Sequence, residues 1–191
     1  MINCKKQLCL FSGKLAQLED AVVSASKTAF KLIDLRKHDG GHPRLGSVDL
    51  IPLHPITEDT SLEDCGEVAR RIATRLANEV PGSSYFLYGA GDDNLQGLIE
   101  RRKQFGWFQS SMRLDQPPDV GAYIPQYGLT GVGSSPYMSN FNISLDTTNM
   151  KVARDVLRTI RDRSGGLPGV SAMAFPHQGS IEVACNVDMF R

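Results

Sequence analysis

The stretch that decides the fold covers residues 32–49 and reads LIDLRKHDGGHPRLGSVD. Two consecutive glycines and a proline at its centre favour a sharp turn of the chain. Before the turn, apolar residues recur every three or four positions over residues 15–34, which predicts a helix with one buried face. After it, residues 48–53 form a short apolar run bounded by proline, which predicts a strand. The stretch therefore connects a helix to a strand.

The same alternation continues along the chain. Ser61 and Asp64 have the spacing of a capping box, and apolar residues then repeat at helical intervals as far as Pro81-Gly82. Residues 84–88 read as a buried strand, and residues 95–103 as a short helix whose basic C-terminal end complements the helix dipole. Strands that alternate with helices predict an α/β or α+β protein.

The second half has a different composition. Glycine and proline are interleaved over residues 121–136, which favours a shaped loop over a regular element. Residues 138–145 alternate as a strand does, and Asp146 or Thr147 can cap a helix that reaches Arg161. Residues 170–175 and 181–187 flank a turn and predict a hairpin.

These patterns predict two small subdomains, which the chain of 191 residues is long enough to form. We place them at residues 1–136 and 137–191, with the seam at the composition shift near residues 117–137. Each subdomain is expected to contain a mixed β-sheet with helices packed on it.

Composition excludes several classes of protein. Lys+Arg and Asp+Glu both number 21, with no long block of like charge, so nucleic acid is not an expected partner. No apolar run approaches the roughly 18 residues of a membrane helix, so neither a membrane span nor a signal peptide is expected. The four cysteines are scattered, which indicates a reducing, cytoplasmic setting.

Four residues around the central turn can carry chemistry: His38, His42, Arg44 and Asp49. Histidine transfers protons near neutral pH, arginine binds carboxylates through a bidentate fork, and aspartate orients a cation or an imidazole. Residue types alone leave open a plain surface turn in which a backbone carbonyl satisfies a histidine. A metal site is not expected, because the glycines and proline argue against a helix that would bring the two histidines together.

Residues 32–49 closely resemble the signature of the formiminotransferase domain, the transferase part of formiminotransferase-cyclodeaminase. Further segments at residues 52–55, 85–89, 118–119 and 140–143 support the resemblance, which spans roughly residues 18–189. Residues 101–108 are most similar to the short, stand-alone members of the family.

The resemblance implies transfer of a formimino group from formiminoglutamate to tetrahydrofolate, a step of histidine catabolism and one-carbon metabolism. It implies a site between two subdomains of a homodimer, with no metal. The histidine followed by Pro-Arg is the family's catalytic residue, so the role falls on His42. His42 would accept the proton lost when the folate nitrogen attacks the formimino carbon, and return one to the departing glutamate. Arg44, Asp49 and His38 would bind substrate.

The family's folate-binding loop follows a Pro-Asp pair, so it falls on eight residues here: Gly121, Ala122, Tyr123, Ile124, Pro125, Gln126, Tyr127 and Gly128. Tyrosines on a glycine-rich loop suit the stacking of a pteridine ring, but they can equally pack at the seam between subdomains.

The chain also departs from the family pattern. Residues 1–14 do not match the strand, helix and strand with which the family begins, and the second subdomain lacks the family's closing helix and last strand. Missing strands leave sheet edges exposed. A catalytically inactive folate-binding or scaffolding relative is therefore the alternative function.

Overall fold

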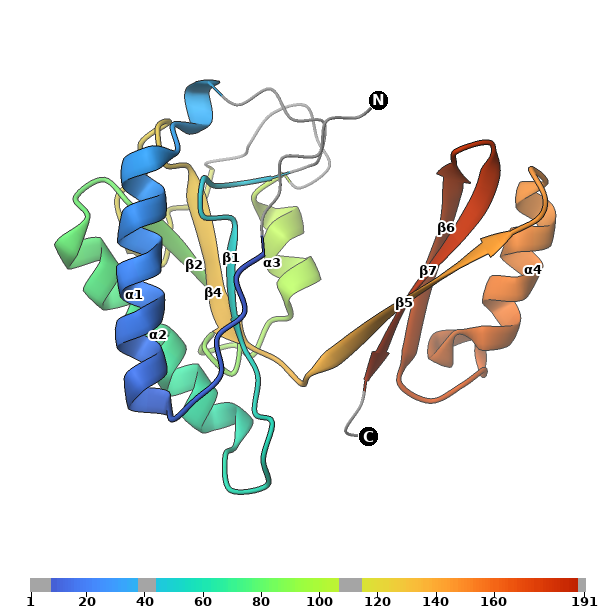
Figure 1. Ribbon diagram of the computed structural model, residues 1–191, viewed down its shortest axis with the longest axis horizontal. Helices are drawn as coiled ribbons and strands as arrows, with labels where there is room; N and C mark the ends of the chain where they lie inside the picture. The colour runs from blue at the N-terminus through green and yellow to red at the C-terminus, as the bar shows by residue number, and fades with distance from the viewer. Residues whose placement is uncertain (1–7, 38–43, 107–114, 189–191) are drawn as a thin grey trace. The chain divides into compact units, whose positions relative to one another are not determined.

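The computed structural model describes residues 8–37, 44–106 and 115–188 of the protein. The chain divides into two compact units, and the boundary between them lies between Ser135 and Pro136 (Figure 1). Four α-helices and two separate sheets are distributed over these units within the described residues, which confirms the α+β class.

The first unit is built on a four-stranded sheet in the order β1-β4-β2-β3. Its strands are β1 (Leu50–Leu53), β2 (Ser84–Gly89), β3 (Val120–Gly121) and β4 (Leu129–Ser134). β4 pairs in parallel with both β1 and β2, whereas β3 runs antiparallel to β2. β1 lies at one edge of the sheet, where a strand that contains Pro52 is tolerated.

The prediction of a loop over residues 121–136 is wrong for its second half. β4 occupies residues 129–134, lies inside the sheet and is buried at every position. The glycines that suggested a loop make room for rings on β2. A Cβ at Gly131 would lie 2.6 Å from Cζ of Phe86, and a Cβ at Gly133 would lie 2.6 Å from Cδ1 of Tyr88. Glycine is needed at these positions because a side chain would clash with the neighbouring rings, and the sequence pattern does not show this contact.

Helices cover both faces of this sheet (Figure 1). α1 (Leu15–Leu32) and α2 (Leu62–Glu79) lie on one face and share a core with Ile51, Tyr85 and Val132. α3 (Leu98–Gln104) lies on the other, where Phe105 at its C-cap meets Phe86. A short 3-10 helix, η1 (Leu35–Lys37), follows α1.

The helix boundaries follow local chemistry. The capping box of α2 is confirmed, because the Asp64 N–H donates to Ser61 Oγ at 3.0 Å and the Ser61 N–H donates to Asp64 Oδ2 at 2.8 Å. α3 begins at Leu98 and not at Leu95, whose φ of 54° belongs to the turn that follows β2.

The second unit is a three-stranded sheet with one long helix. It contains β5 (Met138–Leu145), α4 (Met150–Ile160), the 3-10 helix η2 (Asp162–Ser164), β6 (Val170–His177) and β7 (Ser180–Asp188). The strand order is β5-β7-β6, and the hairpin of β6 and β7 confirms the sequence prediction. The sheet is antiparallel throughout, which differs from the mixed sheet expected.

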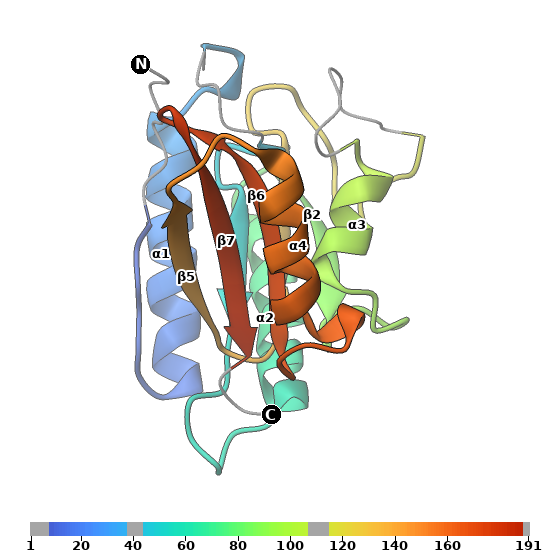
Figure 2. The ribbon, with the colours of Figure 1, turned by 90° about the vertical axis from the view of Figure 1, so that its right-hand side faces the viewer.

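α4 packs on one face of this sheet, around Leu157, Val183 and Cys185 (Figure 2). Its cap is Asn149, whose Oδ1 accepts the Lys151 N–H at 2.9 Å. The predicted cap at Asp146 or Thr147 is therefore wrong, because the turn after β5 extends further before the helix starts. Across the described ranges, no helix is both long and apolar enough to span a membrane.

Candidate functional site

The candidate site lies where two connecting segments meet at the amino ends of β1 and β4. One is residues 44–49, which lead into β1, and the other is residues 121–128, which lead into β4. Gly46 and Gly128 form an isolated antiparallel bridge, and the Leu129 N–H donates to the Leu45 carbonyl at 2.8 Å. The Ser47 N–H donates to the Tyr127 carbonyl at 2.8 Å. The two segments are therefore held together through their backbones.

The chain before residue 38 is bound to the same loop. The Leu35 N–H donates to the Gln126 carbonyl at 2.8 Å. Both ends of the segment that carries His38 and His42 are thus hydrogen-bonded to residues 121–129. The two histidines themselves lie outside the described residues.

Glycine shapes the loop of residues 121–128 at both ends. Gly121 and Gly128 have φ of 83° and 71°, in the left-handed region. A Cβ at Gly128 would lie 2.3 Å from the Leu45 carbonyl oxygen, so this position also demands the absence of a side chain. The close contact between the two segments therefore depends on Gly128.

The two tyrosines of the loop have different surroundings. The Tyr127 ring packs on Phe30 of α1, with the ring centroids 5.1 Å apart, and belongs to the rim of the core. Tyr123 is half-buried, and no ring contact to it is found among the described residues. Tyr127 therefore acts in packing.

Asp49 connects the segment to α3. Its Oδ1 accepts the Leu45 N–H at 2.7 Å, and its Oδ2 lies 3.1 Å from Nη2 of Arg102. The side chains of Asp49 and Arg102 are only 12% and 15% exposed, so this is a largely buried ion pair. We call it the Asp49–Arg102 pair. It fixes the backbone at Leu45, the residue after Arg44.

Tyr88 lies near the Asp49–Arg102 pair and affects the pKa of Arg102. Burial lowers the pKa of Arg102, and the nearby Asp49 and Tyr88 oppose that shift. Burial also raises the pKa of the Tyr88 phenol well above its usual value, while Arg102 acts in the other direction. Arg102 stays a cation and Tyr88 stays neutral near pH 7. The charge of Arg102 is therefore matched by that of Asp49.

Sequence reasoning missed Arg102 and Tyr88 as members of the site. The basic end of the third helix was interpreted as a complement to the helix dipole, yet two of its residues have specific partners. Arg101 is buried, donates to the Leu87 carbonyl at 3.0 Å and binds Asp119 at 2.6 Å. Because Asp119 immediately precedes β3, Arg101 secures the entry to the loop of residues 121–128.

Among the sequence-predicted residues, Arg44 and Asp49 lie in the segment whose backbone is hydrogen-bonded to residues 127–129. Arg44 is half-buried and directly precedes Leu45. Within the described ranges, no group of three or more metal-ligating side chains gathers in one place.

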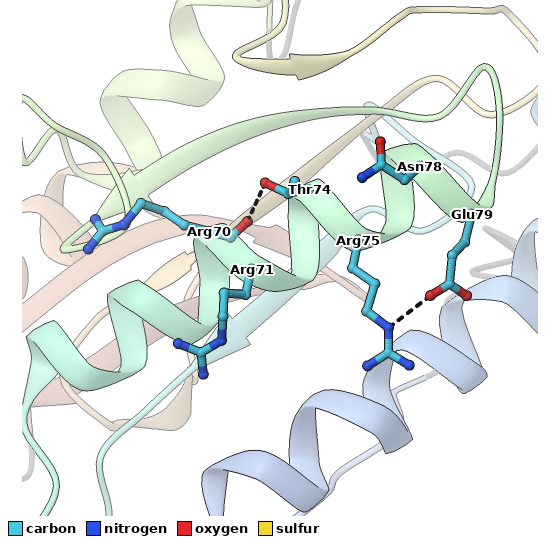
Figure 3. Close-up of a pocket in the computed structure, with 6 residues that line it drawn as sticks. All are labelled: Arg70, Arg71, Thr74, Arg75, Asn78 and Glu79. Carbon is cyan, nitrogen blue, oxygen red and sulfur yellow. Dashed lines mark hydrogen bonds and ion pairs between the residues drawn. The ribbon is translucent and has the colours of Figure 1, made fainter.

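An open hollow lies on the surface of α2, away from the candidate site (Figure 3). Its arginines already have partners: Arg71 binds Glu19, and Arg75 binds Asp20 and Glu79. The pairs with Glu19 and Asp20 join α2 to α1, the pair with Glu79 lies within α2, and together they leave little unbalanced charge for a ligand. Six residues line the hollow: Arg70, Arg71, Thr74, Arg75, Asn78 and Glu79.

Comparison with known protein families shows which family shares this sequence. The pattern of the formiminotransferase domain, N-terminal subdomain, matches residues 5–135, more than half of the chain. The chain belongs to the formiminotransferase domain family. The match covers the whole candidate site, from η1 to the loop of residues 121–128. The resemblance of residues 32–49 to the family signature is thereby confirmed.

Individual relatives extend the match into the second unit. The formiminotransferase cyclodeaminase-like protein of Arabidopsis thaliana is 34% identical over 93% of this chain and 64% of its own length. A glutamate formimidoyltransferase of Thermoplasma acidophilum is 27% identical over 99% of this chain and 65% of its own length. The formimidoyltransferase-cyclodeaminase of Sus scrofa is 30% identical, over 82% of this chain and 29% of its own length. The chain thus spans less than two thirds of the length of these formiminotransferase relatives.

Proposed function

We propose that this protein transfers a formimino group from formiminoglutamate to tetrahydrofolate at the amino ends of β1 and β4. One observation carries the proposal: both ends of the segment with His38 and His42 are hydrogen-bonded to the loop of residues 121–129. The segment that supplies the proposed base and the loop that would hold the folate therefore meet at one edge of the sheet. The relatives named for this reaction support it.

His42 is the proposed general acid and base. As the folate nitrogen bonds to the formimino carbon, His42 takes the nitrogen's proton, and when the carbon–glutamate bond breaks it returns a proton to the leaving amine. A histidine suits both steps because its ordinary pKa lies near neutral pH. Two residues, Pro43 and Arg44, separate His42 from Leu45, whose N–H donates to Asp49 Oδ1.

Arg44 and His38 are the proposed substrate contacts. Formiminoglutamate and the glutamate tail of folate both carry carboxylates, which a guanidinium binds through two parallel hydrogen bonds. The role that we propose for Asp49 differs from the direct contact with substrate expected from the sequence. Its two oxygens accept from Leu45 and Arg102, so we propose that it positions Arg44 without touching substrate.

Tetrahydrofolate is the proposed second substrate, with its pteridine on residues 121–128. Tyr123 is the stacking side chain, because Tyr127 packs on Phe30. We further propose that the protein is a cytoplasmic homodimer. The cysteines of the described residues, Cys9, Cys65 and Cys185, are free thiols, as in a reducing compartment.

The test follows formimino transfer from formiminoglutamate to tetrahydrofolate, with folinic acid binding measured alongside. We expect turnover by the wild type and a loss of at least about 100-fold in kcat for His42→Ala, the usual worth of a general acid–base group. His38→Ala is the matched control and should mainly raise KM. Folinic acid binding without any turnover would contradict the transfer reaction and support the non-catalytic alternative.

A further inference from the structure

The loop of residues 121–128 crosses over the beginning of β2. β3, which precedes the loop, and β4, which follows it, lie on either side of β2 in the sheet. Ser84, the first residue of β2, pairs with Gly121 on one side and with Leu129 on the other. The two ends of the loop are therefore separated by the width of one strand, and Ser84 occupies that strand.

The first half of the loop contacts the residues just before β2. The Ala122 N–H donates to the Ser83 carbonyl at 3.3 Å. Gly82 has a φ of 91°, and a Cβ added there would lie 2.7 Å from Cδ1 of Ile124. The Ile124 side chain therefore lies directly against a glycine whose left-handed backbone suits the turn into β2. The beginning and the middle of the loop are thus held by residues 82–83.

The end of the loop is held by a side chain. The Ser84 hydroxyl donates to the Gly128 carbonyl at 3.0 Å, and Ser84 is only 1% exposed. A buried hydroxyl is costly unless it is hydrogen-bonded, so this bond accounts for a serine at a position that is apolar in most strands. Gly128 also bridges Gly46. The Ser84 hydroxyl is therefore linked through Gly128 to residues 44–49.

We propose that Ser84 is a positioning residue for folate, which acts through Gly128 and sets the span of the loop of residues 121–128. This role rests on the function proposed above, in which the loop holds the pteridine. Ser84 does not touch the ligand, because its side chain is buried. A loop that is already fixed in its binding shape loses less conformational freedom when the ligand binds. Without the hydroxyl, the end of the loop can move away from β2, and binding must restore its shape.

Folinic acid binding by the full chain tests this role. Ser84→Ala should raise the Kd for folinic acid about 10-fold, the upper end of what one hydrogen bond contributes. KM for tetrahydrofolate should rise with it, while kcat changes little because His42 is unaltered. Ser134→Ala is the matched control, since Ser134 in β4 is also 1% exposed and its hydroxyl donates to the Leu62 carbonyl at 2.7 Å. This control should bind folinic acid as the wild type does.

Circular dichroism checks that each variant folds. Ser84→Cys fills a similar space with a weaker donor and should raise the Kd less than Ser84→Ala does. It takes the place of Ser84→Ala if that variant does not fold. An unchanged Kd in the folded Ser84 variants, or an equal rise in Ser134→Ala, would overturn the role of Ser84 and leave the proposed function standing.

Hydrogen exchange without ligand tests the anchoring independently of folate. The Leu129 amide, which donates to the Leu45 carbonyl, should exchange about 5-fold faster in Ser84→Ala than in Ser134→Ala. Equal exchange in the two variants would overturn the anchoring whether or not folate binds. A wild type that binds no folinic acid would overturn both the proposed function and the role of Ser84 in it.

Discussion

The sheet of the first unit is covered by helices on both faces, whereas the sheet of the second unit is covered by α4 alone. The first sheet brings together large buried rings, among them Tyr85, Phe86 and Tyr88. The second buries only small clusters, and Phe141 remains exposed. Buried apolar area is the main favourable term in folding, so the first unit should be the more stable of the two.

The two units also differ in the features that they carry. The first unit carries the candidate site on a scaffold whose two faces are both filled, which keeps the site's geometry fixed. The second unit leaves large apolar side chains such as Phe141 and Met173 exposed among the described residues. Substitutions placed in each unit can therefore measure this difference in stability.

The largest expected effect is that of Arg102→Ala in the first unit. Removal of Arg102 leaves the buried Asp49 carboxylate without its cation, which we expect to cost about 3 kcal/mol. Arg158→Ala, which breaks the exposed pair with Asp155 in the second unit, should cost at most about 0.5 kcal/mol. Hydrogen exchange of the Val132 and Val183 amides reports the two units separately. Equal losses from the two variants would contradict a structural role of the Asp49–Arg102 pair.

A smaller effect is expected of Gly128→Ala. Its φ of 71° disfavours alanine, and the added Cβ would press on the Leu45 carbonyl at 2.3 Å, so we expect a loss of about 2 kcal/mol. Gly165→Ala in the second unit has a similar φ of 81° but an open surrounding, so about 1 kcal/mol should be lost. Urea unfolding of each variant gives the difference, which measures the contact between residues 44–49 and the loop. Identical losses of stability in the two variants would show that the contact between residues 44–49 and the loop adjusts to the added Cβ at little cost.

The helix caps should differ only slightly between the units. Ser61→Ala removes the hydroxyl half of a capping box, and Asn149→Ala removes a single bond, so each should cost about 1 kcal/mol. Ser61→Ala should additionally raise the pKa of Asp64, because the Ser61 hydroxyl is the main group that lowers it. An NMR titration of Asp64 in the variant checks this, and an unchanged pKa would contradict it.

The smallest effect at neutral pH is that of Tyr85. Its substitution should distinguish the two units only at alkaline pH. Burial raises the pKa of Tyr85 to about 12. A pKa raised in the folded state means that the neutral phenol stabilises the fold below its unfolded pKa, about 10, and that this stability is lost as pH rises toward 12. The first unit should therefore unfold first in alkali. Tyr85→Phe should move its transition to higher pH, and an unmoved transition would refute this cause.

Local signals in the sequence predicted local structure well. The capping box at Ser61, the hairpin of β6 and β7 and the helical periodicity of α1 and α2 all depend on residues close in the chain. β4 was missed because its glycines are explained only by Phe86 and Tyr88, more than 40 positions earlier. Short-range pattern cannot show that kind of demand.

The same limit applies to the candidate site. Arg44 and Asp49 stood out because they lie beside the central turn, and resemblance to the family pointed to the loop of residues 121–128. Arg102 did not stand out, since 53 positions separate it from Asp49 and its role exists only in the folded protein. An arginine in an amphipathic helix gives no sign of burial until its partner is known.

The location proposed for the site, at the amino ends of β1 and β4, differs from the usual rule for parallel sheets, in which ligands bind at the carboxyl ends of the strands. Hydrogen exchange of the full chain with and without folinic acid tests the location directly. The account predicts added protection of amides in residues 44–49 and 121–128, at the amino ends. Protection confined to residues 54–61 and 89–97, at the carboxyl ends, would contradict it.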